Sequence, residues 1–133
     1  RKVRRHIMLD VCAGVIIKNN QVLLARRPKG SHLAGFWEFP GGKIEPGETP
    51  EECLKRELRE ELAIEAKIGD FICVSEYDYV EKSIKLLAYY VEITGEPQLK
   101  AHDSLAWIDL KQIDLQILAP ADRLIAQKIK RDN

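Results

Sequence analysis

The chain opens with two runs in which apolar residues dominate and polar residues recur at short intervals. Residues 9–18 and 21–27 are rich in valine, isoleucine and leucine, and an Asn-rich turn at Asn19 and Asn20 separates them. This pattern is typical of two strands joined in a β-hairpin. The apolar part of the first run is shorter than the roughly 20 residues that span a bilayer. We therefore expect a buried strand and no membrane partner.

Glycines and prolines interrupt the pattern after the hairpin. Residues 27–35 are predicted to form a loop, and residues 40–42, Pro-Gly-Gly, are expected to hold no regular structure. Beyond the centre of the chain, residues 64–80 and 83–94 alternate enough to predict two more strands. Residues 105–110 predict a further short strand after a second loop.

Two helices are predicted, one central and one at the end of the chain. Thr49 fits an N-cap, Pro50 the first helical position and Glu52 the capping-box acid. Apolar stripes at helical spacing follow in the central helix (Leu54, Leu58 and Leu62) and in the tail, residues 120–130 (Leu124, Ile125 and Ile129). Strands before and after a central helix predict an α/β fold, with a mixed β-sheet sandwiched between helices in the order α-β-α.

Composition narrows the class of protein. A length of 133 residues with 45% hydrophobic and 32% charged residues predicts one domain over residues 1–133, with residues 1–7 as a flexible terminus. The 21 basic and 21 acidic residues cancel, so no overall field would hold a polymeric nucleic acid. The three cysteines lack metal-ligand and CxxC spacing, so we expect reduced, packed thiols and a cytoplasmic protein.

Glutamates are concentrated on the central helix. At about 100° per residue, Glu57, Glu60 and Glu61 share one face beside the leucine stripe, and such like charges repel one another. One interpretation is a solvated face neutralised by Lys55, Arg56 and Arg59. The other is a hard divalent cation such as Mg²⁺, which clustered carboxylates and a backbone carbonyl from the preceding glycine turn would suit.

The same segment resembles a known family. The Nudix box, G-x5-E-x7-R-E-U-x-E-E-x-G-U with U apolar, is matched here by Gly42, Glu48, Arg56, Glu57, Leu58, Glu60, Glu61 and Ile64. Ala63 stands where the family usually has glycine, which we expect to shift the local turn without abolishing the site. The stretches "ARRP", "EFPGGKIEPGETP" and "LAPADRLIAQKI" are similar to those of MutT-type Nudix hydrolases. The resemblance therefore covers most of the chain and implies a Nudix fold.

The resemblance implies roles for residues of the box. The Gly41 carbonyl and the carboxylates of Glu57, Glu60 and Glu61 would bind Mg²⁺, with Mn²⁺ as a substitute. Arg56 would pair with Glu48 to brace the loop, and Glu57 is our first choice for the base or the group that orients the attacking water. The reaction implied is the Mg²⁺-dependent splitting of a nucleoside triphosphate into monophosphate and pyrophosphate by water, which suits metal-assisted phosphoryl transfer.

A further acid commonly lies several residues before a tryptophan in related enzymes. The stretch "AHDSLAW" has no glutamate, so Asp103 or, as a second choice, His102 is expected to take this role. The alternative is a plain loop, because loops favour Asp.

Three residues are candidates for substrate binding. Arg27 suits a phosphate, although a surface arginine is the alternative. Phe39 would stack on a base, or else belongs to the core. Asp122 stands where the related oxidised-guanine enzymes have asparagine. As an ionised acceptor it suits an exocyclic amine such as cytosine N4, although an acidic residue in a first helical turn is the plain alternative.

The substrate predicted is thus a small nucleotide, of the cytidine type or oxidised, for an enzyme that is a monomer or homodimer. The main alternative is an 8-oxo-dGTP diphosphatase. A dinucleoside polyphosphate hydrolase, suggested by Tyr77 and Tyr79, is a weaker one. A non-catalytic nucleotide-binding module is weaker still, because such modules generally lose box carboxylates that this chain keeps.

Overall fold

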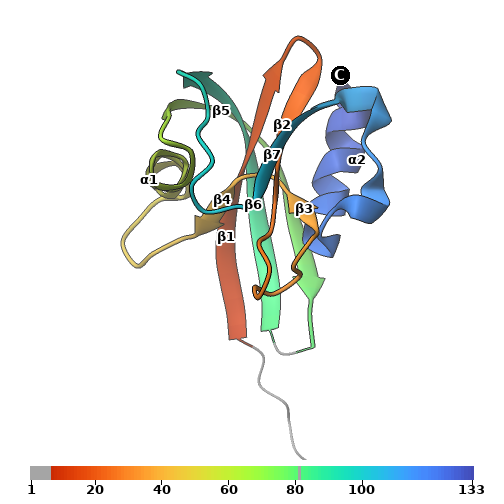
Figure 1. The fold of residues 1–133 in the computed structure, drawn as a ribbon. Helices are drawn as coiled ribbons and strands as arrows, with labels where there is room; N and C mark the ends of the chain where they lie inside the picture. Colours follow the sequence, from red (N-terminus) through yellow and green to blue (C-terminus); the bar gives the residue numbers. More distant parts are fainter. Residues whose placement is uncertain (1–6, 81) are drawn as a thin grey trace, which may run out of the picture.

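The computed structural model describes residues 7–80 and 82–133, which form a mixed sheet with a helix on each side (Figure 1). The predicted flexible terminus falls on residues 1–6, outside the described residues, and on Ile7. For Ile7 the prediction is wrong, because strand β1 begins there.

The described residues form a seven-stranded sheet in the order β3-β2-β1-β6-β5, with β4 paired to β1 and β7 to β2. The strands are β1 (Ile7–Lys18), β2 (Gln21–Arg26), β3 (Trp37–Glu38), β4 (Gly41–Lys43), β5 (Glu65–Asp78), β6 (Lys82–Thr94) and β7 (Ser104–Asp109). Among the strand-to-strand pairings of the described residues, only that of β1 with β6 is parallel, so the sheet is mixed as predicted. The predicted β1-β2 hairpin is confirmed, and Asn19 and Asn20 take the positive φ angles that such a turn requires.

The Pro-Gly-Gly segment differs from its prediction. Gly41 and Gly42 do not lie in irregular structure but pair with Ala13 and Cys12 as strand β4. A Cβ atom at Gly41 would lie 2.0 Å from the carbonyl oxygen of Cys12, so only glycine allows this approach. Turn-forming residues were therefore a poor guide, because glycine here serves close strand packing.

Helix α1 (Pro50–Leu62) covers one face of the sheet. Its leucine stripe is fully buried, as predicted, and packs with Cys12 and Ile16 of β1. Cys12 and Cys53 are free and buried with their sulfur atoms 2.8 Å apart, while Cys73 is half-buried. The prediction of packed, reduced thiols is therefore confirmed for Cys12 and Cys53, and burial raises the pKa of both thiols.

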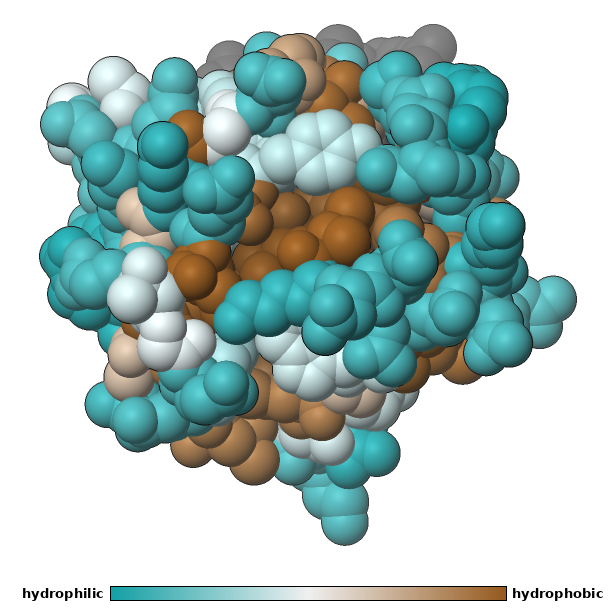
Figure 2. Space-filling model, turned by 90° about the horizontal axis from the view of Figure 1, so that it is seen from above, coloured by the Kyte–Doolittle hydropathy of each residue, from teal (hydrophilic) through white to brown (hydrophobic). Residues whose placement is uncertain are grey.

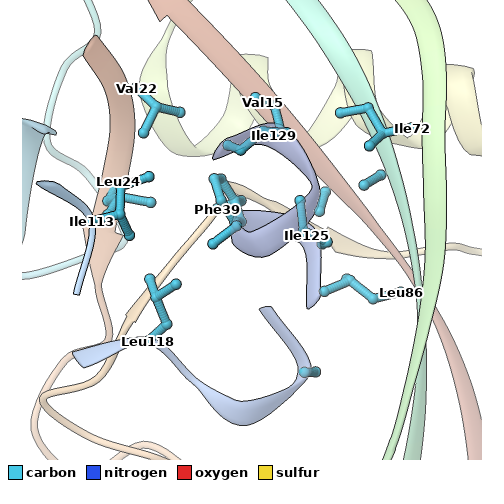
Figure 3. Close-up of a cluster of buried hydrophobic side chains, with 14 of the residues drawn as sticks. Val15, Val22, Leu24, Phe39, Ile72, Leu86, Ile113, Leu118, Ile125 and Ile129 are labelled. Atoms are coloured by element: carbon cyan, nitrogen blue, oxygen red, sulfur yellow. The ribbon is translucent and has the colours of Figure 1, made fainter. Parts of the chain in front are cut away.

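Helix α2 (Arg123–Asp132) covers the opposite face, which confirms the α-β-α sandwich. The hydrophobic core between α2 and the sheet includes Phe39 and Ile125 (Figure 3). Short 3-10 turns precede α2 at Leu110–Gln112, Leu115–Ile117 and Pro120–Asp122. The predicted helix over residues 120–130 therefore begins as a 3-10 turn and is α-helical only from Arg123. The prediction that Leu124 faces the core is wrong: its side chain is 47% exposed, because Ile125, Ala126 and Ile129 set the buried face.

The outer surface is predominantly hydrophilic at the end seen in Figure 2, where polar side chains surround an apolar hollow. Within the part of the chain that the structure describes, no helix is both long and apolar enough to cross a membrane.

Candidate active site

Helix α1 is fixed at both ends by local interactions. The Thr49 side chain accepts a hydrogen bond from the Glu52 N–H at 3.1 Å, and the Glu52 carboxylate accepts one from the Thr49 N–H at 2.9 Å, which confirms the capping box. At the other end, Ala63 itself adopts the left-handed conformation, with φ 54°, and its N–H donates to the Arg59 carbonyl. The prediction that this turn would shift in the absence of glycine is therefore wrong, because Ala63 takes the left-handed conformation that glycine favours.

Arg56 connects the helix to the loop before it. Its Nε and Nη2 donate to the two Glu48 carboxylate oxygens at 2.6 and 2.9 Å, as the resemblance implied. Its Nη1 donates to Glu57 at 2.7 Å and to Glu60 at 3.0 Å. The Arg56 hydrogen bonds, helped by the Glu45 N–H, lower the pKa of Glu48 to about 2. One guanidinium thus fixes the loop and two box carboxylates together.

The side chains of Glu57 and Glu61 lie against strand β4, which contains Gly41 and Gly42. A Cβ atom at Gly42 would lie 2.3 Å from the Glu57 carboxyl group, so the missing side chain makes room for that carboxylate. Burial raises the pKa of Glu61 well above its ordinary range, and so do the hydrogen bond and charge of Glu57, while the Gly41 N–H opposes this shift. Two carboxylates held this close favour sharing a proton or a cation.

The site can be tested for its fit to a divalent cation. The Glu61 Oε1 atom is buried without a hydrogen-bond partner, beside a second carboxylate and the Gly41 backbone, and hard oxygen donors of this kind suit Mg²⁺ or Mn²⁺. In residues 7–80 and 82–133, no three His, Cys, Asp or Glu side chains are already arranged as a ligand set. Arg56 accounts for this, because it holds Glu57 and the 59% exposed Glu60 in ion pairs. The carboxylate oxygens therefore suit a cation that would compete with Arg56 for Glu57 and Glu60.

A cavity of about 500 Å³ adjoins Glu61. It lies between β1, β6, the loop after β2 and the turn before α2. The lining includes all three predicted substrate-binding residues, Arg27, Phe39 and Asp122, together with Glu38, Gly41 and His102. The structure thus brings two of the predicted metal residues, Gly41 and Glu61, to one cavity with the substrate residues, whereas Glu57 and Glu60 do not line it.

The three substrate candidates are held in different ways. Arg27 Nη1 contacts Glu38 at 3.1 Å, and its Nε donates to the His32 carbonyl at 2.5 Å. Phe39 is buried in the core and also lines the cavity, so both of its interpretations hold in part. The Asp122 carboxylate is buried and accepts a hydrogen bond from the Phe39 N–H at 2.9 Å. Burial and the charge of Glu38 raise its pKa well above the ordinary value.

Asp103 and His102 separate on the loop before β7. Asp103 is paired with Arg26 at 2.7 Å and does not line the cavity, so the structure places it beside the site rather than in it. His102 lines the cavity, and its Nε2 lies 2.8 Å from Glu38 Oε2. The second choice of the sequence analysis is therefore the one that faces Glu61.

Sequence reasoning missed Glu38. It lies between Trp37 and Phe39 in the two-residue strand β3, and its carboxylate contacts both Arg27 and His102. The available signal was a charged residue between two aromatic residues. Side chains alternate along a strand, so Glu38 points to the face opposite to that of Trp37 and Phe39. The tyrosines were less informative: Tyr79 lines the cavity and accepts a hydrogen bond from Ala121, whereas Tyr77 is 41% exposed.

Comparisons with known proteins agree with this geometry. The family model described as "NUDIX domain" matches residues 8–129. The chain is 40% identical to the CTP pyrophosphohydrolase of Escherichia coli K12 over 116 residues, which cover 86% of each chain. It is 36% identical to the 8-oxo-dGTP diphosphatase of the same organism over 125 residues, covering 92% of this chain and 97% of that protein.

Solved structures show the same architecture. The solution structure of the E. coli ORF135 protein matches with a TM-score of 0.83 and 38% identity, over 95% of this chain and 91% of that one. The crystal structure of a MutT NUDIX hydrolase from Burkholderia pseudomallei matches with a TM-score of 0.84 and 27% identity, over 92% and 98% of the two chains. The similarity therefore extends over nearly the whole fold.

Proposed function

Because this chain belongs to the NUDIX domain family, we propose that it hydrolyses nucleoside triphosphates to monophosphate and pyrophosphate with Mg²⁺, and that cytidine nucleotides are its main substrates. That it is a hydrolase of acid anhydrides follows from the family and from its named relatives. What we propose beyond this is the identity of the metal ion, the nucleobase of the preferred substrate and the roles of individual residues. We also propose that it acts in the cytoplasm, as a monomer or homodimer.

One observation carries the proposal: Glu61 of the box lines the same cavity as Arg27, Phe39 and Asp122, while Arg56 holds the neighbouring carboxylates of Glu57 and Glu60 on the same helix. A triphosphate must meet positive charge and a positioned water, while its base must find a separate recognition surface. When bound, a divalent cation neutralises phosphate charge and lowers the pKa of the attacking water. The cavity offers room for phosphates at the Glu61 end and for a base at the Asp122 end.

The protein groups have distinct roles in this mechanism. Glu57, Glu60 and Glu61, with the Gly41 carbonyl, are the residues that would hold the cation. Glu57 would also orient the attacking water and accept its proton, because its carboxylate lies against Gly42, which lines the cavity. Arg56 and Glu48 hold the loop before α1 in a fixed position relative to the helix during turnover.

Base recognition rests on Asp122. One carboxylate oxygen is committed to the Phe39 N–H, which fixes the orientation of the group at the cavity wall. An ionised carboxylate accepts from an exocyclic amine such as cytosine N4, and Phe39 lies next to it to contact the base plane. The 40% identity to a CTP pyrophosphohydrolase supports the same choice.

Oxidised guanine nucleotides are the second candidate. Because burial raises the pKa of Asp122, its carboxyl group is protonated more often here than in water. The protonated group can donate a hydrogen bond to a keto oxygen, as the asparagine amide does. The similarity to an 8-oxo-dGTP diphosphatase also favours this substrate.

The experiment is to measure pyrophosphate and phosphate release, with and without Mg²⁺ or Mn²⁺. The panel holds CTP, dCTP, 5-methyl-dCTP, 8-oxo-dGTP, dGTP and a diadenosine polyphosphate. We expect metal-dependent pyrophosphate with the highest kcat/KM for a cytidine nucleotide. A preference for 8-oxo-dGTP would favour the second candidate, and no pyrophosphate from any triphosphate would contradict both.

A further inference from the structure

We propose that His102 Nδ1 and Glu61 Oε1 together bind the divalent cation of this site, and that Glu38 orients the imidazole for this purpose. The inference rests on the proposed function, because it adds a nitrogen ligand to the same metal site. It also means that the loop before β7 contributes to the metal site through His102, since Asp103 is paired with Arg26 and the loop stretch AHDSLAW has no glutamate.

The first argument comes from two buried atoms that lack partners. Among the described residues, only Glu61 Oε1 and His102 Nδ1 are side-chain polar atoms that are buried without a hydrogen bond. They face each other at 4.0 Å, and the His102 side chain is only 7% exposed. Burying an unsatisfied polar atom is costly, so such atoms usually serve a bound ligand, an ion or a water. Two of them aimed at one point indicate a shared ligand.

The second argument is the orientation of the ring. His102 Nε2 lies 2.8 Å from Glu38 Oε2, and Glu38 is held in turn by Arg27 Nη1 at 3.1 and 3.3 Å. When Nε2–H donates to the carboxylate, the neutral ring has its lone pair on Nδ1, which faces Glu61. Histidines that bind metals typically donate their other N–H to a carboxylate in this way. A plain core histidine would need a donor to Nδ1, and none is present among the described residues.

The separation suits a cation after a small movement. Nitrogen and oxygen ligands lie about 2.0–2.2 Å from Mg²⁺ or Zn²⁺, so two adjacent ligands of one ion are roughly 3 Å apart. Closing the present 4.0 Å requires a shift of about 1 Å in side chains that line an open cavity. A shift of Glu61 breaks no ion pair of Arg56, because Arg56 holds Glu57 and Glu60 but makes no ion pair with Glu61 among the described residues.

A nitrogen ligand changes which metals bind well. Imidazole favours transition ions, whereas sites made only of oxygen suit Mg²⁺. We therefore expect this chain to bind Mn²⁺ and Co²⁺ more tightly relative to Mg²⁺ than a site of carboxylates alone would. Replacing His102 with glutamine should weaken Mn²⁺ binding by about 10- to 100-fold, the range seen when metal-site partners are lost, and should weaken Mg²⁺ binding less.

The test uses Mn²⁺ alone with the whole chain. Pulsed electron paramagnetic resonance detects a nitrogen bound to Mn²⁺ through its modulation of the electron spin echo. We expect ¹⁴N modulation in the wild type, a change to the ¹⁵N frequency when histidine is ¹⁵N-labelled, and loss of the signal in His102→Gln. The matched control is His32→Gln, which changes another histidine lining the cavity and should keep the signal. Labelling requires no mutation, so the test does not depend on how the variant folds.

The outcomes separate this inference from the proposed function. Bound Mn²⁺ without nitrogen modulation would overturn the inference and would indicate that a water satisfies Nδ1, while pyrophosphate release would still support the proposed function. Loss of modulation in His32→Gln but not in His102→Gln would overturn it as well. Histidine modulation in a protein that cleaves no triphosphate would support the metal ligand and contradict the proposed function.

Discussion

Arg56 and Glu48 face each other through two parallel hydrogen bonds of 2.6 and 2.9 Å across the turn that leads into α1. The pair joins the loop to the helix, and the same guanidinium reaches Glu57 and Glu60. Such a planar, two-point contact cannot be made by a lysine, which offers one point charge. The geometry of the box therefore depends on arginine and not only on positive charge.

Arg56→Lys should lower kcat while the protein stays folded. The variant keeps a charge but loses the fixed fork, and misplacement of catalytic groups by about 1 Å can cost roughly 100-fold in rate. Steady-state hydrolysis and circular dichroism would measure the two effects. Arg59→Lys is the matched control, since Arg59 lies on the same helix but pairs with the exposed Glu65 of β5. Equal activity in Arg56→Lys and wild type would contradict the bracing role.

Glu60→Gln should remove most turnover without unfolding the protein. It takes away one ligand charge at constant volume, and the side chain is 59% exposed, so packing is little affected. We expect a loss of roughly 100-fold or more in kcat. The control is Glu51→Gln, an exposed acid in the first turn of the same helix that should retain activity. Near-normal turnover in Glu60→Gln would exclude Glu60 from the metal set.

Asp122→Asn should move substrate preference from cytidine nucleotides toward keto-bearing purines. The amide can still accept the Phe39 N–H through its oxygen, but toward the cavity it offers a donor. The ratio of kcat/KM for dCTP and 8-oxo-dGTP should fall by about tenfold or more, because a lost or mismatched hydrogen bond is worth about 1–3 kcal/mol. An unchanged ratio would mean that Asp122 only fixes the turn before α2.

The same variant should change the pH dependence of stability. Because burial raises the pKa of Asp122 in the folded protein, the contribution of Asp122 to stability is greatest below the unfolded value of 3.8 and falls as pH rises toward the folded pKa. Asp122→Asn has no such loss, about 1.4 kcal/mol for each unit by which folding raises the pKa. Urea unfolding should show the variant to be the more stable protein at pH 7, with the difference shrinking near pH 3.8. A wild type as stable as the variant at pH 7 would contradict this account.

Ala63→Gly should stabilise the protein. Ala63 ends α1 in the left-handed conformation, with φ 54°, which costs a residue with a Cβ atom about 1 kcal/mol relative to glycine. Allowing for the greater freedom of glycine in the unfolded chain, we expect a gain of about 0.5 kcal/mol in the free energy of unfolding. Ala63→Val is the opposing variant, because a β-branched residue is poorly tolerated at positive φ. Thermal unfolding should rank the three proteins Gly, Ala, Val.

Interactions within short stretches were readable from the sequence alone. The capping box of Thr49 and Glu52, the leucine stripe of α1 and the pairing of Arg56 with Glu48 all join residues fewer than ten positions apart. Helix geometry and local hydrogen bonding fix such contacts once the residue types and spacing are known. The box and its arrangement of carboxylates therefore followed from the order of residues.

Tertiary structure decided the rest of the site. Glu38 and His102 are 64 positions apart, and Phe39 and Asp122 are 83 apart, so their contacts depend on how β3, the loop before β7 and the turn before α2 pack together. The strand β4 and the exposure of Leu124 likewise arise from pairing and packing that local pattern does not encode. The sequence by itself determined the family and the helix that carries the box carboxylates. Only the folded chain decided which side chains share the cavity, because long-range register sets those distances.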